Sequence, residues 1–284
     1  MSDDQQQPPP RSTGVPNQLV FVTGLHRSGT SLLFRCLRDH PHISGFSKTG
    51  VPEDEGQHLQ SVIPTARHFG GPGRFGFDPA AYLDEQSPLA RPASADKMMA
   101  EWAPYWDLSR PILIEKTPPT LIRTRFFQAL FPEAKFVVVL RHPLAVAYAT
   151  YKWKGWTVRK RDGLSLGRLI EHWLITHERF AADVGHLQQV KVILYEHLVA
   201  QPDDIFAQLY EFLGVEPAAQ RQEIRSNIND SYFQRWQNLQ NHPLKFPYAA
   251  ALIRRYEKRV QPFGYSLTDL SLAQRPPFLA VKGT

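Results

Sequence analysis

Short apolar runs alternate with longer stretches of helical periodicity along most of this chain. The runs are rich in β-branched and aromatic residues and end at glycine or polar residues, which is typical of buried strands. They cover residues 18–24, 112–116, 134–140 and 190–195. Amphipathic stretches occupy residues 31–40, 121–130, the segment from 143 onward, 165–184 and 202–214. This alternation predicts an α/β fold of three layers, with a central, mainly parallel sheet flanked by helices.

Two of the helical stretches show further helix signals. The first has an apolar stripe at helical spacing, formed by Leu32, Leu33, Cys36 and Leu37. The stretch at 202–214 is the last clear helix in the sequence. Proline in its first turn and glycine at its end mark its start and stop.

Two segments break this rhythm. Residues 1–17 are rich in Gln, Pro and Ser, which predicts a disordered N-terminal tail because they offer little apolar surface to bury. Residues 45–105 carry many Pro and Gly and few strand signals, and they are too long for a plain connector. We therefore expect a single domain over 18–284, with 45–105 as an insertion that forms a lid or binding wall.

Composition narrows the class of protein. Of 284 residues, 42 % are hydrophobic and 21 % are charged, which is enough apolar material for a globular core. The net charge of +6 suits an anionic ligand but does not by itself indicate nucleic-acid binding. One cysteine permits no internal disulfide, no apolar run is long enough to span a membrane, and the polar start is unlike a signal peptide. These features predict a cytoplasmic protein with no nucleic-acid partner.

A glycine-rich loop joins the first predicted strand to the first predicted helix. Gly24 and Gly29 have the G-x-x-x-x-G spacing of a P-loop, whose backbone N–H groups and following helix N-terminus hold phosphate. An NTPase places Lys next, but Thr30 stands there, so ATP or GTP turnover is poorly supported. Arg27 supplies a cation inside the loop instead. The alternative is a plain strand–helix turn with an exposed arginine.

Four segments in order resemble the sulfotransferase family, whose donor is 3′-phosphoadenosine 5′-phosphosulfate (PAPS). GLHRSGTSLL is similar to the family's 5′-phosphosulfate-binding loop. The other three segments are residues 113–118, 136–150 and 192–215. Arg235-Trp236 and residues 263–266 loosely resemble the tyrosylprotein-type members. The resemblance is to a bacterial-type sulfotransferase, with motifs closest in style to those of tyrosylprotein and carbohydrate sulfotransferases. The resemblance spans residues 18–266 and implies a P-loop-like donor site.

The resemblance implies roles for individual residues. Donor binding is assigned to His26, Arg27, Ser28, Gly29, Thr30, Ser31, Arg141, Thr150, Tyr195 and Arg235. The family usually has Ser eight residues after the arginine that binds the 3′-phosphate, but here that position is Ala149, so Thr150 is expected to substitute. Arg27 and Lys116 are expected to stabilise charge on the leaving phosphate. For Lys116 the alternative is a surface lysine at a strand end, and Tyr195 is almost equally well explained as a core tyrosine.

The acceptor needs a general base, and one segment of the insertion offers four candidates. These are Glu53, Asp54, Glu55 and His58. We favour Glu55 because it precedes an expected helical turn, and His58 three residues later could share its face. The alternative is an acidic cluster that only stabilises a helix N-terminus.

The sequence thus predicts an enzyme that transfers a sulfuryl group from PAPS to an acceptor hydroxyl, or an amine, and releases adenosine 3′,5′-bisphosphate. No metal is expected, since the His and Cys residues have no HExxH or CxxC spacing. The acceptor stays open among carbohydrate, peptide, lipid and small phenol. Two alternatives are a divergent P-loop kinase and a nucleotide-binding module without catalysis.

Overall fold

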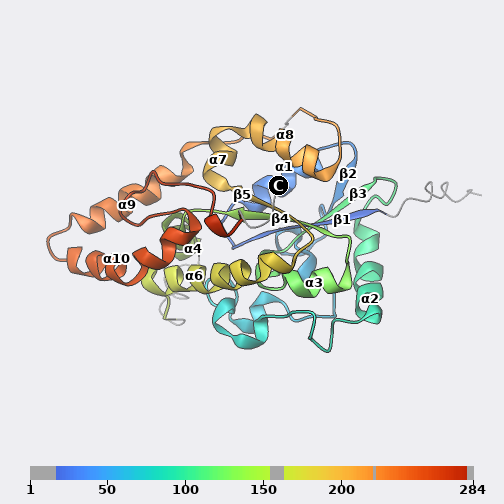
Figure 1. Ribbon diagram of the computed structural model, residues 1–284, viewed down its shortest axis with the longest axis horizontal. Coiled ribbons are helices and arrows are strands. Elements are labelled where there is room, and N and C mark those ends of the chain that lie inside the picture. The colour runs from blue at the N-terminus through green and yellow to red at the C-terminus, as the bar shows by residue number, and fades with distance from the viewer. Residues whose placement is uncertain (1–16, 154–162, 220–221, 280–284) are drawn as a thin grey trace, which may run out of the picture.

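A five-stranded sheet with every strand pair parallel forms the centre of the molecule (Figure 1). The computed structural model describes residues 17–153, 163–219 and 222–279. The strand order is β2-β3-β1-β4-β5. The strands are β1 (Gln18–Gly24), β2 (Ile43–Gly45), β3 (Ile112–Lys116), β4 (Lys135–Leu140) and β5 (Gln189–Leu194). The α/β class that the sequence predicts is confirmed.

The strand register brings three strand ends to one edge of the sheet. Val22 of β1 lies opposite Lys116 at the end of β3, and Gly24 lies opposite Val139 near the end of β4. The chain segments that leave β1, β3 and β4 therefore emerge together, where open α/β sheets bind their ligands. The central strands are buried on both faces, which is why they read as continuous apolar runs.

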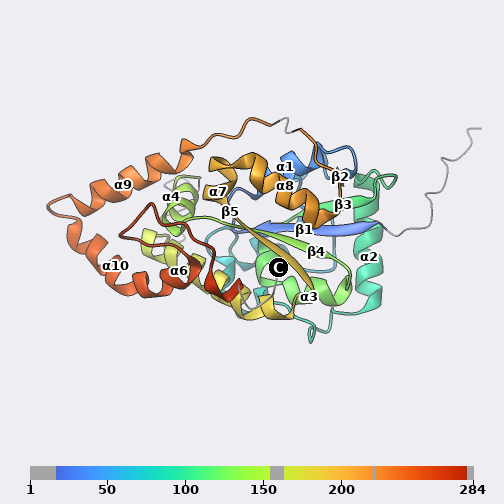
Figure 2. The same ribbon diagram turned by 45° about the horizontal axis from the view of Figure 1, so that its top comes forward.

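Helices cover both faces of the sheet (Figures 1 and 2). One face carries α1, α7 and α8, and the other carries α3 and α6, with α2 beside α3. The helices are α1 (Thr30–Arg38), α2 (Pro92–Trp102), α3 (Thr124–Leu130), α4 (Pro143–Trp153), α6 (Leu166–Asp183), α7 (Tyr195–Ala200), α8 (Pro202–Leu213), α9 (Asp230–Gln240) and α10 (Phe246–Val260). This arrangement gives the three predicted layers.

Two element boundaries differ from the sequence expectation. The helix expected over 121–130 is divided, because a 3-10 helix over Pro118–Ile122 precedes α3. Prolines 118 and 119 have no N–H to donate, so they suit a short first turn better than a helix interior. Tyr195, expected at the end of a strand, is the first residue of α7.

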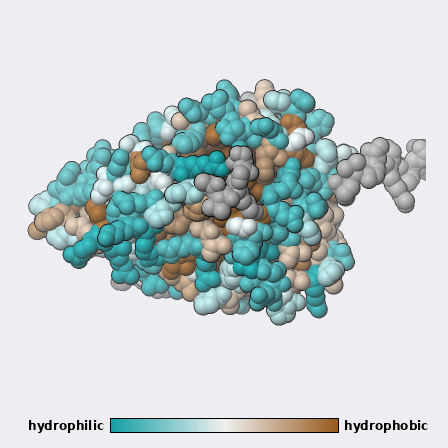
Figure 3. Space-filling view, viewed as in Figure 1, coloured by the Kyte–Doolittle hydropathy of each residue, from teal (hydrophilic) through white to brown (hydrophobic). Residues whose placement is uncertain are grey.

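Five helices and strands were not predicted: β2, α2, α7, α9 and α10. Strand β2 has only three residues, too few to show a period. Helices α9 and α10 project from the body of the molecule (Figure 1), so the helix at 202–214 is not the last one. Hydrophobic side chains lie at the outer end of this projection on an otherwise mainly hydrophilic face (Figure 3), and Leu244 between the two helices is 85 % exposed.

The segment 45–105 contains short 3-10 helices followed by α2. Trp102 at the end of α2 is buried, and its indole N–H donates to the carbonyl of Gly56 at 3.0 Å. This bond ties the beginning of the segment to its end and places the stretch around Gly56 over the end of β3. The N-terminal tail expected over 1–17 lies outside the described residues except for Asn17.

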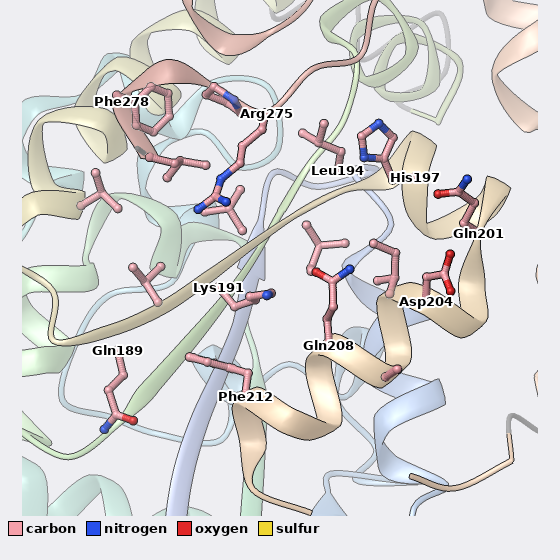
Figure 4. A pocket seen from close by; sticks show the side chains of 18 of the residues that line it. Gln189, Lys191, Leu194, His197, Gln201, Asp204, Gln208, Phe212, Arg275 and Phe278 are labelled. Carbon is pink, nitrogen blue, oxygen red and sulfur yellow. The ribbon is translucent and has the colours of Figure 1, made fainter. Parts of the chain in front are cut away.

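A groove of about 900 Å³ runs along the open edge of the sheet at β5 (Figure 4). Lys191 lies beside Gln208 and Phe212 of α8, while Arg275 and Phe278 lie on the other side of the strand. No residue of the glycine-rich loop lines this groove, so the groove is separate from the expected phosphate site. In the described ranges, no helix is both long and apolar enough to cross a membrane.

Candidate active site

The loop between β1 and α1 depends on both of its glycines. Gly24 and Gly29 have φ angles of +145° and +106°. A methyl group on Gly24 would lie 2.4 Å from the carbonyl oxygen of Val139, and one on Gly29 would lie 2.4 Å from the ring of Tyr195. Because Gly29 caps α1 without a side-chain hydrogen bond, the first N–H groups of the helix stay available to an anion.

A cavity of about 280 Å³ with several arginines opens on one side of this loop. Arg35, Arg141 and Arg225 line it together with Arg27. Glu223 is the acidic residue in its wall, and its side chain is already paired with Arg225. The remaining lining residues are Gly29, Thr30, Ser31, Leu32, Tyr195, Ile228 and Tyr232. This excess of cations suits a ligand with more than one phosphate.

Arg141 is buried at the end of β4 and holds the loop from beneath. Its Nη1 donates to the carbonyl oxygen of Arg27 at 2.8 Å. Its Nε and Nη2 donate to Oδ1 of Asn229 at 3.0 and 2.6 Å, and its guanidinium carbon lies 4.1 Å from the centre of the Tyr195 ring. These contacts fix the guanidinium in the wall of the cavity, where its remaining N–H groups can meet an anion.

A second cavity, of about 520 Å³, lies on the other side of the loop. Arg27, Thr30 and Ser31 line both cavities, so the two spaces meet at the loop. Its other walls come from the 45–105 segment, Pro118 and Trp153. The charged or titratable residues among them are Glu53, Glu55, His58, Arg67 and Arg74. Residues of the 45–105 segment therefore line a cavity next to the loop.

Lys116 and Glu55 form a buried ion pair at this second cavity. The Lys116 Nζ lies 3.2 Å from Oε1 of Glu55, and the two side chains are 1 % and 7 % exposed. The same Nζ donates to the carbonyl oxygen of Glu53 at 2.9 Å, and Gln57 donates to Oε2 of Glu55 at 2.5 Å. Glu55 lines the cavity whereas Lys116 does not. Each Glu55 oxygen thus has one donor and keeps a lone pair for a substrate proton.

The sequence also matches a family model over residues 19–219, described as "Sulfotransferase family". The chain belongs to the sulfotransferase family. The resemblance carried by the loop and strand-end motifs is thereby confirmed. Helices α9 and α10 lie beyond the matched range.

Among curated proteins, the sulfotransferase chain is similar to the nodulation protein NoeE of Sinorhizobium fredii and to the protein-tyrosine sulfotransferase of Drosophila melanogaster. Identity to NoeE is 26 % over 223 residues, covering 70 % of this chain and 51 % of NoeE. Identity to the Drosophila protein is 24 % over 221 residues, covering 76 % and 41 %. This chain therefore spans about half, or less, of the length of these relatives.

The fold is similar to that of the sulfotransferase STF9 from Mycobacterium avium. The TM-score is 0.50 at 14 % sequence identity, and the match covers 93 % of this chain and 79 % of STF9. At this identity the likeness bears on the fold alone, and it agrees with the P-loop-like α/β architecture expected from the sequence.

The four candidates for a general base lie in different surroundings in this sulfotransferase. Asp54 does not line the cavity, because its carboxylate accepts from the backbone N–H groups of Lys48 and Thr49 and holds a turn. Glu53 is exposed at the cavity wall. His58 is half-buried there, and burial lowers its pKa, so its ring is neutral at neutral pH. Glu55 combines burial, a cationic partner and access to the cavity.

Other predicted donor contacts differ in their placement. Tyr195 lines the arginine-rich cavity and His26 the second cavity. Ser28 is buried in the loop, and its Oγ has no hydrogen-bond partner among the described residues. Thr150 and Arg235 line neither cavity.

The surroundings of these last two side chains explain their placement. Thr150 is buried in α4 with its methyl group facing Gly73. Ala149 is equally buried and also lines neither cavity, so the expected substitution by Thr150 stays a prediction. Arg235 is exposed on α9, next to Trp236, which is buried and donates to the carbonyl of Leu267.

Sequence reasoning missed the group that supports Arg141 from α7 and the start of α9. Asn229 donates to Oε1 of Glu196 at 2.8 Å, and the Tyr265 hydroxyl donates to Oε2 of Glu196 at 2.9 Å. Glu196 lies in a segment with the family resemblance, but nothing in its pattern pointed to this role. Asn229 lies 88 residues after Arg141, in a stretch with no recognisable motif.

In the part of the chain that the structure describes, no group of three or more His, Cys, Asp or Glu side chains is placed to hold a metal ion. The polar groups at the loop are instead cations, hydroxyls and N–H donors. A donor set of this kind fits phosphate and sulfate oxygens rather than a metal.

Proposed function

We propose that this chain transfers a sulfuryl group from PAPS to the hydroxyl, or less favourably the amine, of an acceptor and releases adenosine 3′,5′-bisphosphate. One observation carries the proposal: two cavities meet at a single phosphate-type loop. The cavity on one side is rich in arginine, and the cavity on the other holds a carboxylate paired with a buried lysine. A donor and an acceptor bound on the two sides would meet at Arg27, Thr30 and Ser31.

The residues of the loop fit the donor. The free N–H groups at the start of α1 and the Arg27 side chain can donate hydrogen bonds to the 5′-phosphosulfate oxygens. Arg141, fixed in the adjoining cavity, is the candidate for the 3′-phosphate. Tyr195 in the same wall offers a ring face to the nucleotide.

In the reaction, an acceptor oxygen attacks sulfur while the bond from sulfur to the 5′-phosphate oxygen breaks. The electron pair of that bond stays on the phosphate, where Arg27 and the loop N–H groups stabilise the charge. The acceptor proton passes to the carboxylate of Glu55. Lys116, which is buried behind Glu55, acts as a positioning residue and not as a direct cation on the phosphate.

The acceptor is defined here only by the group that reacts and by the space beside it. The cavity of about 520 Å³ is lined by Arg67 and Arg74 as well as by the acidic residues and Trp153. Carbohydrate, peptide, lipid and phenol acceptors all carry a suitable hydroxyl. A cytoplasmic location is part of the same proposal, supported by a single cysteine, Cys36, that is buried and forms no disulfide.

Transfer of ³⁵S from labelled PAPS to a panel of these acceptors tests the proposal. Arg27→Ala and Lys116→Ala should each lower turnover by on the order of 10²-fold or more while leaving the chain folded. Lys135→Ala is the matched lysine control, because Lys135 lies at the opposite end of the sheet and donates to the Phe212 carbonyl. Near-normal turnover in either site variant would remove that residue from the mechanism.

A further inference from the structure

Glu115, at the end of β3, is buried beneath the second cavity and takes no direct part in the proposed reaction. The side chain is 1 % exposed. Its Oε1 accepts from the backbone N–H of Gly56 at 3.0 Å and from the Thr117 hydroxyl at 2.5 Å. Gly56 approaches so closely that a methyl group there would lie 2.4 Å from this oxygen. Glu115 therefore holds the residue that directly follows Glu55.

Thr117 holds the next residue of the same stretch. Its hydroxyl oxygen accepts from the backbone N–H of Gln57 at 3.0 Å while its proton is donated to Glu115. Its own carbonyl oxygen accepts from the Thr23 hydroxyl on β1 at 3.0 Å. The contact is thus anchored to β1, the central strand of the sheet.

Gln57 passes this constraint to the candidate base. Its side-chain N–H donates to Oε2 of Glu55, and its side-chain oxygen accepts from the backbone N–H of Ala66 at 2.8 Å. Lys116, between Glu115 and Thr117 in the chain, binds the other oxygen of Glu55. Three consecutive residues of β3 and the following turn therefore grip one short stretch of the insertion.

We propose that Glu115 and Thr117 are positioning residues that hold the Glu55 carboxylate in the acceptor cavity through Gly56 and Gln57. The inference rests on the proposed function for the role of Glu55, but the grip itself is a property of the fold. Such a device matches the demand of proton transfer, since a base displaced by about 1 Å loses much of its effect.

The protonation state of Glu115 is consistent with this role. Burial raises its pKa to about 8, so the side chain is neutral at neutral pH. Its Oε2 has no hydrogen-bond partner among the described residues. Because Glu115 is neutral, the Lys116 ammonium group pairs with Glu55. An ionised Glu115 would compete with Glu55 for that ammonium group.

Hydrogen exchange of the peptide that covers residues 53–58 tests the grip without any assay of activity. Glu115→Ala and Thr117→Val should speed exchange of the Gly56 and Gln57 amides by about tenfold, because each loses its acceptor. Glu115→Gln and Thr117→Ser keep an acceptor oxygen at the same place and should restore most of the protection. Thr176→Val is the control, since among the described residues the Thr176 hydroxyl bonds only within its own helix α6 and is also buried.

Two further readouts separate this inference from the proposed function. Binding of adenosine 3′,5′-bisphosphate should be unchanged in all five variants, while kcat should fall by on the order of 10²-fold in Glu115→Ala and Thr117→Val only. Unchanged exchange in both of these variants overturns the inference, as does an equal loss of kcat in Glu115→Gln. Faster exchange in the variants of a chain that binds no bisphosphate would overturn the proposed function. It would still support the inference that Glu115 and Thr117 hold Gly56 and Gln57 in place.

Discussion

The guanidinium of Arg141 lies over the ring of Tyr195, with its central carbon 4.1 Å from the ring centre. The other edge of that ring contacts Gly29 so closely that no larger residue fits there. Arg141 in turn donates to the carbonyl of Arg27. The end of β4, the start of α7 and the phosphate-type loop are therefore locked to one another at the donor cavity.

Replacement of Arg141 by lysine keeps the positive charge but loses the forked geometry. We expect Arg141→Lys to weaken the binding of adenosine 3′,5′-bisphosphate by roughly 10- to 100-fold, and to weaken the binding of adenosine 5′-monophosphate much less. Calorimetry with both ligands measures the difference. Arg168→Lys serves as the control, because Arg168 stacks on Phe77 at 5.0 Å and lines neither cavity. An equal loss for the two ligands would remove Arg141 from the 3′-phosphate.

A methyl group at Gly29 would strain the backbone, whose φ is positive there, and would also clash with the Tyr195 ring. Gly29→Ala should therefore destabilise the fold by roughly 1–3 kcal/mol and abolish donor binding. Gly50→Ala is a matched control, since Gly50 also has a positive φ (+82°) but would have nothing within 4 Å of the added carbon. Thermal unfolding and calorimetry compare the two. If both variants bind the donor equally well, contact with Tyr195 does not shape the loop.

The raised pKa of Glu115 makes stability depend on pH. The ordinary value is 4.5 and the value in the folded protein is about 8. Between these two values the folded chain keeps a proton that the unfolded chain has released, so a rise in pH favours unfolding. From pH 5 to 8, wild type should lose stability relative to Glu115→Gln by on the order of 1 kcal/mol per pH unit. Urea unfolding of both proteins across this range measures the free energy of unfolding at each pH. Parallel plots of that free energy against pH would contradict the prediction.

Much of the fold can be read from the sequence because the central strands are buried on both faces. β1 and β4 are almost continuous apolar runs, and the loop after β1 shows its glycine spacing directly. β2 leaves too short a pattern, and α9 and α10 follow a long stretch with little apolar periodicity. Contacts that join distant segments were also out of reach.

In the candidate site, too, local patterns predicted some residues, whereas contacts between distant segments could not be predicted. Arg27, Lys116 and Arg141 could be proposed as site residues because each follows or ends a strand at the sheet edge where ligands bind. The Lys116–Glu55 pair joins residues 61 positions apart, and the Arg141–Asn229 bond joins residues 88 apart. No local pattern encodes such pairings. Thr150, expected to substitute for Ala149, is buried in α4 with its methyl group facing Gly73, and its role stays a prediction.

Calorimetric titration with adenosine 3′,5′-bisphosphate, compared with ATP and magnesium, tests the central claim most directly. The account predicts micromolar binding that requires the 3′-phosphate and falls in Arg141→Ala. It also predicts no preference for magnesium–ATP, because Thr30 stands where an NTPase loop has lysine. Absence of bisphosphate binding, or tighter binding of magnesium–ATP, would contradict the donor site and with it the proposed sulfuryl transfer.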